Sequence, residues 1–461
     1  MDYDVIIIGA GMSGLAAGIR LAHFDRRVCI VERHNVCGGL NSYYRRAGRD
    51  FDVGLHAVTN YVPPGVRSTP LPKLLRQLRL TRDDFDLREQ RGSEIRFPSV
   101  TLRFSNNIDR LVADVADHFP DEIDRFRRLI AAIRDYDDIR LDAPTGSARR
   151  WLRDHLRDPL LIDMILCPLM YYGSAQEHDM DRTQFVTMFK SIFLEGFARP
   201  RQGVRRIIAA LVKRYRACGG VFKMRCGVNR INVSGTRVTS LTLDNGDTIA
   251  APTVLSSAGY VETMRLCTDA VPAPTTADVG RVSFVESILV LDAPPRRLGH
   301  DATIEFYNDT DTFHYETPDD LVDPRSGVIC CPNNYQDHDD MPEGLFRVTW
   351  LASPRRWAAL TPDAYQAAKC RCLDDVLRLA DRRVPGLARR VVFTDMFTPR
   401  TIQRFTGHIN GAVYGTPGKL RDGRTRLHNL FLCGTDQGFV GIVGALLSGI
   451  SMANLHVLSD A

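Results

Sequence analysis

The chain has 461 residues, 44% of them apolar and 25% charged, and its formal net charge is +5. Composition and length are those of a globular protein with two or three domains and a large core. Charges of both signs are interspersed, so we do not expect nucleic acid as a partner. The eleven cysteines are scattered and no Cys or His cluster has metal-ligand spacing, so no metal site is predicted. The N-terminus shows no secretory signal, and we expect reduced thiols and a cytoplasmic location.

The first forty residues contain the strongest motif. An apolar run at residues 4–8 leads into a glycine loop, a helical segment that reaches His23, and a second apolar run that ends at Glu32. This order is typical of a dinucleotide-binding unit: a strand, a G-x-G-x-x-G loop, a helix, a second strand and an acid. The glycines allow a tight turn and the approach of a pyrophosphate, the helix N-terminus offers N–H groups to the phosphates, and the acid holds ribose hydroxyls. The loop residues are Gly9, Gly11, Met12, Ser13 and Gly14.

Two further segments extend this motif. The first is G-G-L-N-S at residues 38–42, and the second is F-D-V-G-L-H at residues 51–56. Together with the glycine loop they resemble the flavoprotein superfamily of phytoene desaturases, carotenoid isomerases, retinol saturases and amine oxidases. The resemblance implies FAD as the dinucleotide, with the first segment beside its phosphates and ribityl chain. It also implies that His56, the last residue of the second segment, lies near the isoalloxazine ring.

Residues 61–199 interrupt the nucleotide-binding pattern, and we expect a helical cap there. Apolar side chains recur with helical spacing at residues 71–80, 108–133 and 149–166. The last stretch is also rich in Arg, which fits either an amphipathic helix docked on an anionic membrane surface, such as the inner face of the cell membrane, or a solvated helix. The Met and aromatic side chains of the cap fit plain core, or alternatively a lipophilic substrate tunnel. Tyr172 and, later in the chain, Tyr414 are the candidates for lining such a tunnel.

Residues 200–265 return to the nucleotide-binding domain. The sequence predicts a helix to Tyr215, a strand at 219–222 that continues at 228–231, an Asn-Gly hairpin with a type I′ turn, and a strand that ends at Ala258. This order resembles the same superfamily, in which the V-x-x-I backbone meets the adenine, and the resemblance carries that role to Val228. The chain has Pro-Arg-Gln-Gly before the helix where the superfamily usually shows P-x-G-G, so one glycine is missing.

The sequence from residue 266 to residue 395 predicts a substrate-binding sheet. Antiparallel strands at 282–291, 303–307, 327–331 and 345–350 precede a helix at 362–379. Residues 397–415 resemble the T-P-x-T … N-G-x-x-Y-G stretch of the desaturase, isomerase and saturase branch.

The C-terminal segment predicts the second half of the cofactor site. A buried strand at 430–436 delivers Gly434 and Asp436 beside a glycine-rich helix at 438–453. The pattern resembles the superfamily's C-terminal flavin motif, in which these groups hold the ribityl chain and the flavin C2=O end and stabilise the anionic reduced flavin. Residues 439–458 have about the length of a membrane span, but their glycines and polar side chains favour a buried helix.

The predicted fold is α/β, with a Rossmann-type FAD-binding domain of the two-dinucleotide-binding, glutathione-reductase-like kind and an inserted α+β substrate domain. The FAD-binding domain takes residues 1–60, 200–265 and 396–461; the substrate domain takes the helical cap at 61–199 and the sheet at 266–395. The expected cofactor-binding residues are Gly9, Gly11, Met12, Ser13, Gly14, Glu32, Arg33, Gly39, Leu40, Asn41, Val228, Ala258, Gly434, Asp436, Gly441, Ile442 and Val443.

The resemblance implies an FAD-dependent oxidoreductase that acts on a lipophilic isoprenoid or carotenoid-like polyene by desaturation, saturation or cis-trans isomerisation, with hydride exchange at flavin N5. His56 is the catalytic candidate, and a histidine that only packs beside the ring is the alternative. A flavin amine oxidase, a hydroxysqualene dehydroxylase-like enzyme and a non-catalytic flavin-binding lipid escort remain open. No second G-x-G-x-x-G follows a strand, so we expect no NADPH domain, and the electron partner is O2, a quinone or a diffusible donor.

Overall fold

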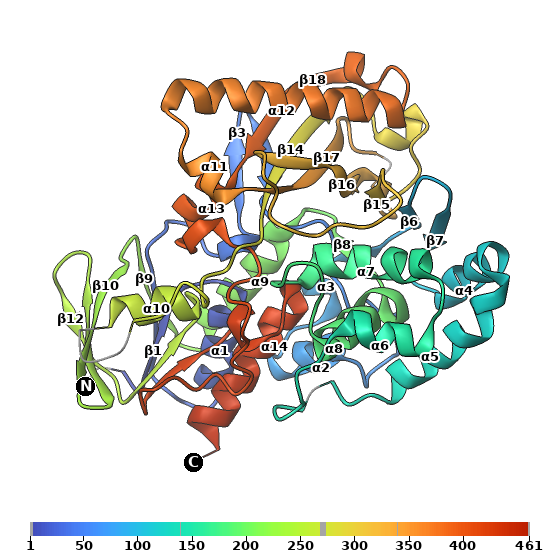
Figure 1. Ribbon diagram of the computed structural model, residues 1–461. Helices are drawn as coiled ribbons and strands as arrows, with labels where there is room; N and C mark the ends of the chain where they lie inside the picture. Colours follow the sequence, from blue (N-terminus) through green and yellow to red (C-terminus); the bar gives the residue numbers. More distant parts are fainter. Residues whose placement is uncertain (1–2, 139, 268–272, 339, 460–461) are drawn as a thin grey trace.

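The computed structural model describes residues 3–138, 140–267, 273–338 and 340–459. Two large sheets organise the chain, one at the lower left and one at the upper right of Figure 1, with a group of helices beside them. The predicted α/β fold, a Rossmann-type FAD-binding unit with a second α+β unit, is confirmed.

The first sheet has five parallel strands, which come from three distant stretches of the chain in the order β19-β13-β1-β2-β9. Four of the strands are short apolar runs that are almost completely buried, as parallel strands require, and the edge strand β9 is partly exposed. The strands are β1 (Val5–Ile8), β2 (Val28–Glu32), β9 (Val221–Met224), β13 (Thr253–Ser256) and β19 (Leu430–Leu432).

Helices cover one face of this sheet and a small antiparallel sheet covers the other. The helices α1 (Met12–Ala22), α9 (Val204–Ala217) and α14 (Gly441–Ala453) share one apolar cluster with β1 and β2. The opposite face packs on a three-stranded sheet of β10 (Val228–Ser234), β11 (Arg237–Leu243) and β12 (Thr248–Ile249).

Two local predictions in this region are wrong. Residues 228–231 do not continue the strand before them, because β9 and β10 belong to different sheets. The hairpin between β11 and β12 is present, but its turn is not type I′: of the Asn245-Gly246 pair, only the glycine has a positive φ, at 87°. A type I′ turn needs positive φ at both positions.

The second sheet has seven strands in the order β18-β14-β17-β16-β15-β6-β7. Helix α12 (Pro362–Arg383) packs across one of its faces, and α7 (Pro159–Gly173) lies on the other side (Figure 1). The strands are β6 (Ser93–Arg96), β7 (Thr101–Phe104), β14 (Ser283–Leu291), β15 (Ile304–Asn308), β16 (Val322–Cys330), β17 (Gly344–Ala352) and β18 (Val391–Phe397). The predicted antiparallel strands of residues 282–351 are therefore present.

The segment expected to be a helical cap is only partly helical. Its strands β6 and β7 extend the second sheet, because β6 pairs with β15. Its helices are α2 (Pro70–Gln77), α3 (Arg82–Phe85), α4 (Ile108–His118), α5 (Ile123–Asp135), α6 (Ala148–His155), α7 and α8 (Arg182–Phe189), with a π-helix at Lys190–Glu195. The remaining short elements of the chain are β3 (Tyr43–Arg46), β4 (Arg49–Asp52), β5 (Leu87–Glu89), β8 (Ala198–Pro200), α10 (Tyr260–Leu266), α11 (Pro354–Ala358) and α13 (Pro399–Thr406).

Proline breaks two stretches that were predicted as single helices. Pro120 separates α4 from α5, and Pro159 opens α7 after the capping residue Asp158. The residue before a proline is pushed out of the helical region, so each stretch becomes two helices.

The break after α6 also divides the stretch of predicted membrane docking, residues 149–166. Leu152, Leu156 and Leu161 are at most 1% exposed and belong to the core beneath the helices. These leucines therefore pack inward, whereas Trp151 and Leu160 of the same stretch are partly buried, and membrane docking stays a prediction.

The two glycine-rich helices α1 and α14 pack closely against each other. A Cβ atom on Gly449 of α14 would lie 2.0 Å from the Ser13 carbonyl oxygen of α1. By length and composition, Gly441–Leu458 could also span a membrane, and half of this stretch is buried inside the protein. The contact with α1 accounts for Gly449 as a packing position.

This contact predicts the effect of one methyl group. Gly449→Ala should lower the free energy of unfolding by about 1–3 kcal/mol or more, because backbone atoms cannot move aside as a flexible side chain can. Chemical denaturation followed by circular dichroism measures this change. Gly92→Ala is the matched control, since a Cβ there would meet nothing closer than 3.7 Å. Equal stability of the two variants would contradict the close packing.

Candidate active site

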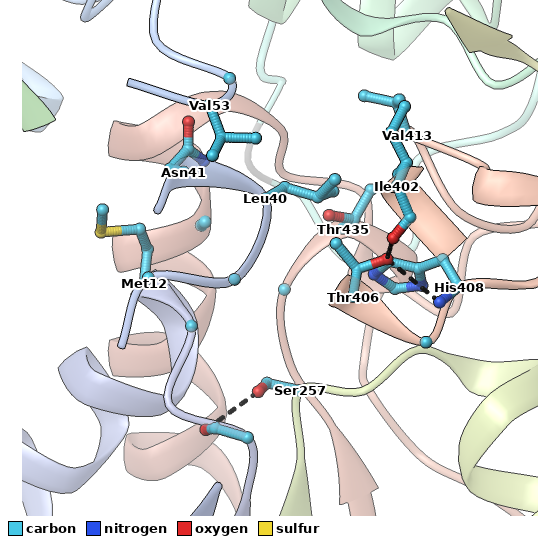
Figure 2. A pocket seen from close by; sticks show the side chains of 18 of the residues that line it. Met12, Leu40, Asn41, Val53, Ser257, Ile402, Thr406, His408, Val413 and Thr435 are labelled. Carbon is cyan, nitrogen blue, oxygen red and sulfur yellow. Dashed lines mark hydrogen bonds between the residues drawn. The ribbon is translucent and has the colours of Figure 1, made fainter. Parts of the chain in front are cut away.

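One cavity of about 630 Å³ lies where the first sheet, the second sheet and the helices meet. Residues from both ends of the chain line it. In Figure 2, Met12, Leu40 and Asn41 stand on one side of the opening, and Thr406 and His408 stand on the other.

Two helix N-termini open onto this cavity. The backbone at the start of α1 (Gly11 to Ser13) and at the start of α14 (Val440 to Ile442) lines it, and neither helix has a side-chain cap. Unpaired N–H groups and the positive end of the helix dipole favour anionic groups at such positions. A flavin dinucleotide has an anionic group for each helix N-terminus. Its pyrophosphate fits the start of α1, and its ring, which becomes anionic on reduction, fits the start of α14.

The glycine loop leaves room where the predicted pyrophosphate would pass. A Cβ atom on Gly11 would meet nothing within 4 Å, so the space beside it is open. Gly14 is needed for close packing and not for ligand space. A Cβ atom there would lie 2.1 Å from the Gly9 carbonyl oxygen, so this glycine allows α1 to pack closely on the end of β1. Gly14 accordingly does not line the cavity.

Glu32 closes the loop from the end of β2. One carboxylate oxygen accepts from the Ala10 N–H at 2.7 Å and the other from the His34 N–H at 2.8 Å. The carboxylate lines the cavity, and its remaining lone pairs are available to ribose hydroxyls.

Most of the predicted cofactor residues lie together in this cavity. They are Gly9, Gly11, Met12, Ser13, Glu32, Arg33, Gly39, Leu40, Asn41, Val228, Ala258, Gly434, Gly441 and Ile442. Val443 does not line the cavity; it is buried in the apolar cluster that α14 shares with α1.

Asp436 is the clearest misassignment among these residues. Its carboxylate is 3% exposed and accepts from the Tyr260 N–H at 2.6 Å and the Thr416 N–H at 2.8 Å. It holds two loops together from outside the cavity. Thr435, one residue earlier, lines the cavity instead.

Sequence reasoning missed several groups at the nucleotide end. The Ser257 hydroxyl, labelled in Figure 2, donates to the Ile8 carbonyl at 2.9 Å and to the Gly9 carbonyl at 3.2 Å, and so joins the segment after β13 to the end of β1 and to the glycine loop. Thr406 ends α13, His408 follows it, and both line the same end of the cavity, where the His408 N–H donates to the Thr406 hydroxyl at 3.2 Å. These residues lie at the ends of a strand and a helix, and no local pattern marks them.

His56 sits at the other end of the cavity and is part of a buried cluster. Its Nε2 lies 3.0 Å and 3.2 Å from the two carboxylate oxygens of Glu286, on β14. Arg347, on the neighbouring strand β17, donates from Nε to the same carboxylate at 2.6 Å. The Thr349 hydroxyl also donates to it. His56 and Glu286 both line the cavity.

The strand register of the second sheet builds this cluster. Glu286 is paired directly with Thr349, and Ile288 with Arg347. Side chains alternate along a strand, so Glu286, Arg347 and Thr349 share the face opposite α12. Trp350, one residue on, packs on the α12 side.

The surroundings of Glu286 keep it ionised. Burial alone would raise the pKa of this carboxyl, but the Arg347 guanidinium and the His56 hydrogen bond lower the pKa to about 2. An ionised carboxylate can only accept hydrogen bonds, so His56 Nε2 carries a proton toward it. In the neutral imidazole Nδ1 is then unprotonated, and no described residue hydrogen-bonds to it. His56 is thus oriented by Glu286, and its Nδ1 has no hydrogen-bond partner among the described residues.

Aromatic side chains form the wall beside His56. The Tyr172 ring lies 6.3 Å from the imidazole, and burial raises the pKa of its phenol well above the usual value. Tyr414 donates its hydroxyl proton to the Tyr171 carbonyl, so it presents mainly its ring. Tyr172 and Tyr414 line the cavity as predicted candidates for a lipophilic tunnel, together with Tyr171, Phe284, Val328 and Val413.

The matching family model covers residues 12–455 and is described as flavin-containing amine oxidoreductase. The chain belongs to this family. Its cofactor is FAD, which the open space at Gly11 and the two uncapped helix N-termini fit, and it is an oxidoreductase.

Relatives of this flavin family match over nearly the whole chain. Prolycopene isomerase 1 from an Oncidium hybrid is 22% identical over 98% of this chain and 83% of its own length. All-trans-retinol 13,14-reductase from Danio rerio is 22% identical, covering 99% of this chain and 87% of its own. Among solved structures, an oxidoreductase from Methanosarcina mazei has a TM-score of 0.68 at 18% identity, with 97% of this chain and 99% of that chain covered.

Gly11→Val tests the FAD position without disturbing the fold. A Cβ atom at this position would meet no neighbouring heavy atom within 4 Å, and the valine side chain would extend into the space beside the loop. We expect the purified variant to be colourless near 450 nm and to melt at the same temperature as flavin-free wild-type protein. A yellow variant with stoichiometric FAD would show that the phosphates pass elsewhere.

Glu286→Gln tests the buried ion pair. It leaves Arg347 buried without its counter-charge, and we expect a loss of about 3 kcal/mol of unfolding free energy near neutral pH. The pKa of Glu286 is lowered from 4.5 to about 2, so its contribution is present above pH 4.5 and is lost as the pH falls toward 2. Wild type and variant should therefore converge in acid.

Glu343→Gln is the control for this measurement. Its carboxylate pairs with Arg49 at 2.6 Å, the same distance, but both side chains are at least 30% exposed. A surface pair contributes about 0–1 kcal/mol, so this variant should stay near wild type.

Proposed function

We propose that the protein exchanges a hydride with a lipophilic isoprenoid polyene and moves a proton at the neighbouring carbon. The observation that carries this proposal is the oriented His56–Glu286 pair in a cavity end whose other walls are aromatic and aliphatic. Such a wall suits a hydrocarbon chain, and the pair supplies a group that can take or return a proton.

FAD supplies the hydride exchange when it is bound. The protein's own contribution lies in His56, whose Nδ1 accepts a proton from carbon as a C=C bond forms, or returns it as the bond is saturated. The Nε2–H bond to Glu286 keeps the ring in the required tautomer and stabilises the imidazolium that results. Arg347 in turn holds Glu286 through its Nε and holds the Val53 and Leu55 carbonyls through its terminal nitrogens.

The relatives support a polyene substrate. Their names specify prolycopene in one case and all-trans-retinol in the other, with isomerisation and reduction as the reactions. Because the two reactions differ, the proposal is hydride exchange with a polyene and leaves the direction to experiment. A cytoplasmic location stays a prediction, as does an electron partner that is O2, a quinone or a diffusible donor.

Amine oxidation is the second candidate, because the family's description includes amines. An assay with both substrate classes separates the two. Prolycopene and all-trans-retinol, with oxidised or pre-reduced enzyme, should give new polyene products by chromatography. Release of peroxide from a panel of amines, with the polyenes unchanged, would overturn the polyene proposal.

His56→Ala tests the base. We expect the variant to keep its yellow FAD and to lose about 10²–10⁴-fold in polyene turnover, the usual effect of removing a general base. His314→Ala removes an exposed histidine and serves as the control. Turnover within a factor of two of wild type in His56→Ala would reduce His56 to a packing residue.

A further inference from the structure

Four helices beside the first sheet carry positive charge without any negative charge. The helices α1, α2, α9 and α14 share one apolar cluster, and none of them contains Asp or Glu. Three of them have basic residues in their last turn, which are Arg20 in α1, Arg76 in α2, and Arg214 and Arg216 in α9. Since charges of both signs are interspersed in the chain as a whole, this one-sided charge is a local feature.

Cations from α1, from α9 and from the turn after α2 meet at His23, just after α1. Arg214 Nε donates to His23 Nε2 at 3.2 Å, and burial together with the charges of Arg214, Arg79 and Arg20 lowers the pKa of this imidazole. None of the three arginines forms an ion pair within the described part of the chain, and the exposed Asp25 nearby pairs with none of them. Like charges held close together repel, so an anionic partner would stabilise this arrangement.

An apolar strip lies beside these cations. The stretch Gly441–Leu458 is only half buried, and its side chains Leu447, Leu455 and Leu458 are partly exposed. Their spacing places them on one side of the helix. Helix α14 contacts both α1 and α2 and lies between them in the lower part of Figure 1. The apolar strip therefore has a helix that ends in basic residues on each side.

Phe24 connects the apolar strip to the cations. Its side chain is 50% exposed. The Arg20 guanidinium lies over its ring, 4.6 Å from the centroid, and Nε of the same arginine donates to Asn454 Oδ1 at 2.8 Å. Arg20 thus holds an exposed aromatic ring next to the Gly441–Leu458 stretch.

The apolar side chains favour a bilayer over a soluble anionic partner. Basic residues alone fit either partner, because both offer negative charge. Helices that lie on a membrane combine Lys and Arg with Phe and Leu, and the apolar side chains enter the boundary between headgroups and acyl chains. Anionic headgroups attract the basic residues. Both kinds of side chain occur together at this surface.

We propose that this surface docks the protein on an anionic phospholipid bilayer, with the Gly441–Leu458 stretch lying along the membrane and not crossing it. Phe24 and the three partly exposed leucines enter the apolar boundary. The lipid phosphates are contacted by Arg20, Lys73, Arg76, Arg79 and Arg214. The docking does not depend on the proposed polyene chemistry, but it would give the protein access to lipophilic molecules dissolved in the bilayer.

Flotation of the FAD-loaded protein with vesicles tests the proposal. We expect binding to vesicles of equal parts phosphatidylglycerol and phosphatidylcholine at low salt, release at high salt, and no binding to phosphatidylcholine alone. The triple variant Lys73→Gln, Arg76→Gln, Arg79→Gln removes three exposed cations. Its binding should be about a hundredfold weaker, at an unchanged melting temperature, because each basic residue near an anionic surface contributes about fivefold.

The matched control also tests the other predicted docking stretch, residues 149–166. The triple variant Arg150→Gln, Arg153→Gln, Arg157→Gln removes three exposed cations there, and its binding should stay within threefold of wild type. Loss of binding in this variant alone would overturn the proposal. So would equal binding of wild type to vesicles without phosphatidylglycerol. Binding to polyglutamate with none to the anionic vesicles would overturn it as well, in favour of an acidic protein partner.

Phe24→Trp tests which side chains enter the bilayer. Of the three native tryptophans, Trp350 and Trp357 are buried and Trp151 of α6 is partly exposed. With spin-labelled lipid in the anionic vesicles, the fluorescence of Phe24→Trp should fall markedly more than that of wild type. Quenching as strong in wild type would place Trp151 at the bilayer and overturn the proposal. Binding is measured without substrate, so none of these results bears on the proposed function.

Discussion

The ion pair between Glu286 and Arg347 is the interaction on which the active site depends. It lies inside the second sheet, and the exposed fraction of each side chain is 4% or less. Two charges at such depth are stable because their own polar atoms are hydrogen-bonded: Glu286 accepts from Arg347, His56 and Thr349, and all three Arg347 nitrogens donate. Arg347 reaches across to the Val53 and Leu55 carbonyls, so the pair connects the second sheet to the segment that carries His56.

A second buried arginine holds that same segment from the other side. Arg199 donates to the Leu55 carbonyl at 2.5 Å and to the His56 carbonyl at 3.1 Å, and it pairs with Asp52. The Asp52 carboxylate also accepts from the Val204 N–H, at the start of α9. The backbone around His56 is therefore held by two guanidinium groups, and the imidazole has one orientation relative to the cavity.

The parts of the site that sequence predicted are those made by short continuous motifs. The glycine loop with Glu32 and the Gly441 helix start are local, because a turn and a helix N-terminus need only neighbouring residues. Glu286 and Arg347 are 61 residues apart and meet only through strand pairing. A signal was present: each is a charged residue in the middle of an apolar strand, where it requires a partner. Which residue becomes that partner depends on how the two strands pair, and neither strand sequence alone determines this register.

The errors in the fold have two origins, one local and one long-range. Two helical patterns were joined across Pro120 and Pro159, although local chemistry stops them there. Strands β6 and β7 were assigned to a helical region because their partner β15 lies some 200 residues later, and edge pairing of this kind follows from tertiary contacts. Asp436 was given to the cofactor by resemblance, whereas its carboxylate is used by two backbone amides.

The contact between α1 and α14 has a consequence for how the protein is made. The first helix is complete after Ala22, but the helix it packs against begins at Gly441. During synthesis the glycine loop therefore emerges early and waits for almost the whole chain before its partner exists. A fragment that lacks α14 has only half of the FAD site, and the part of α1 that α14 covers stays exposed even after β1, β2 and α9 have packed on the rest of the helix. Cofactor supply thus acts at the end of folding, and a shortage of flavin would leave a nearly finished protein exposed to chaperones and proteases.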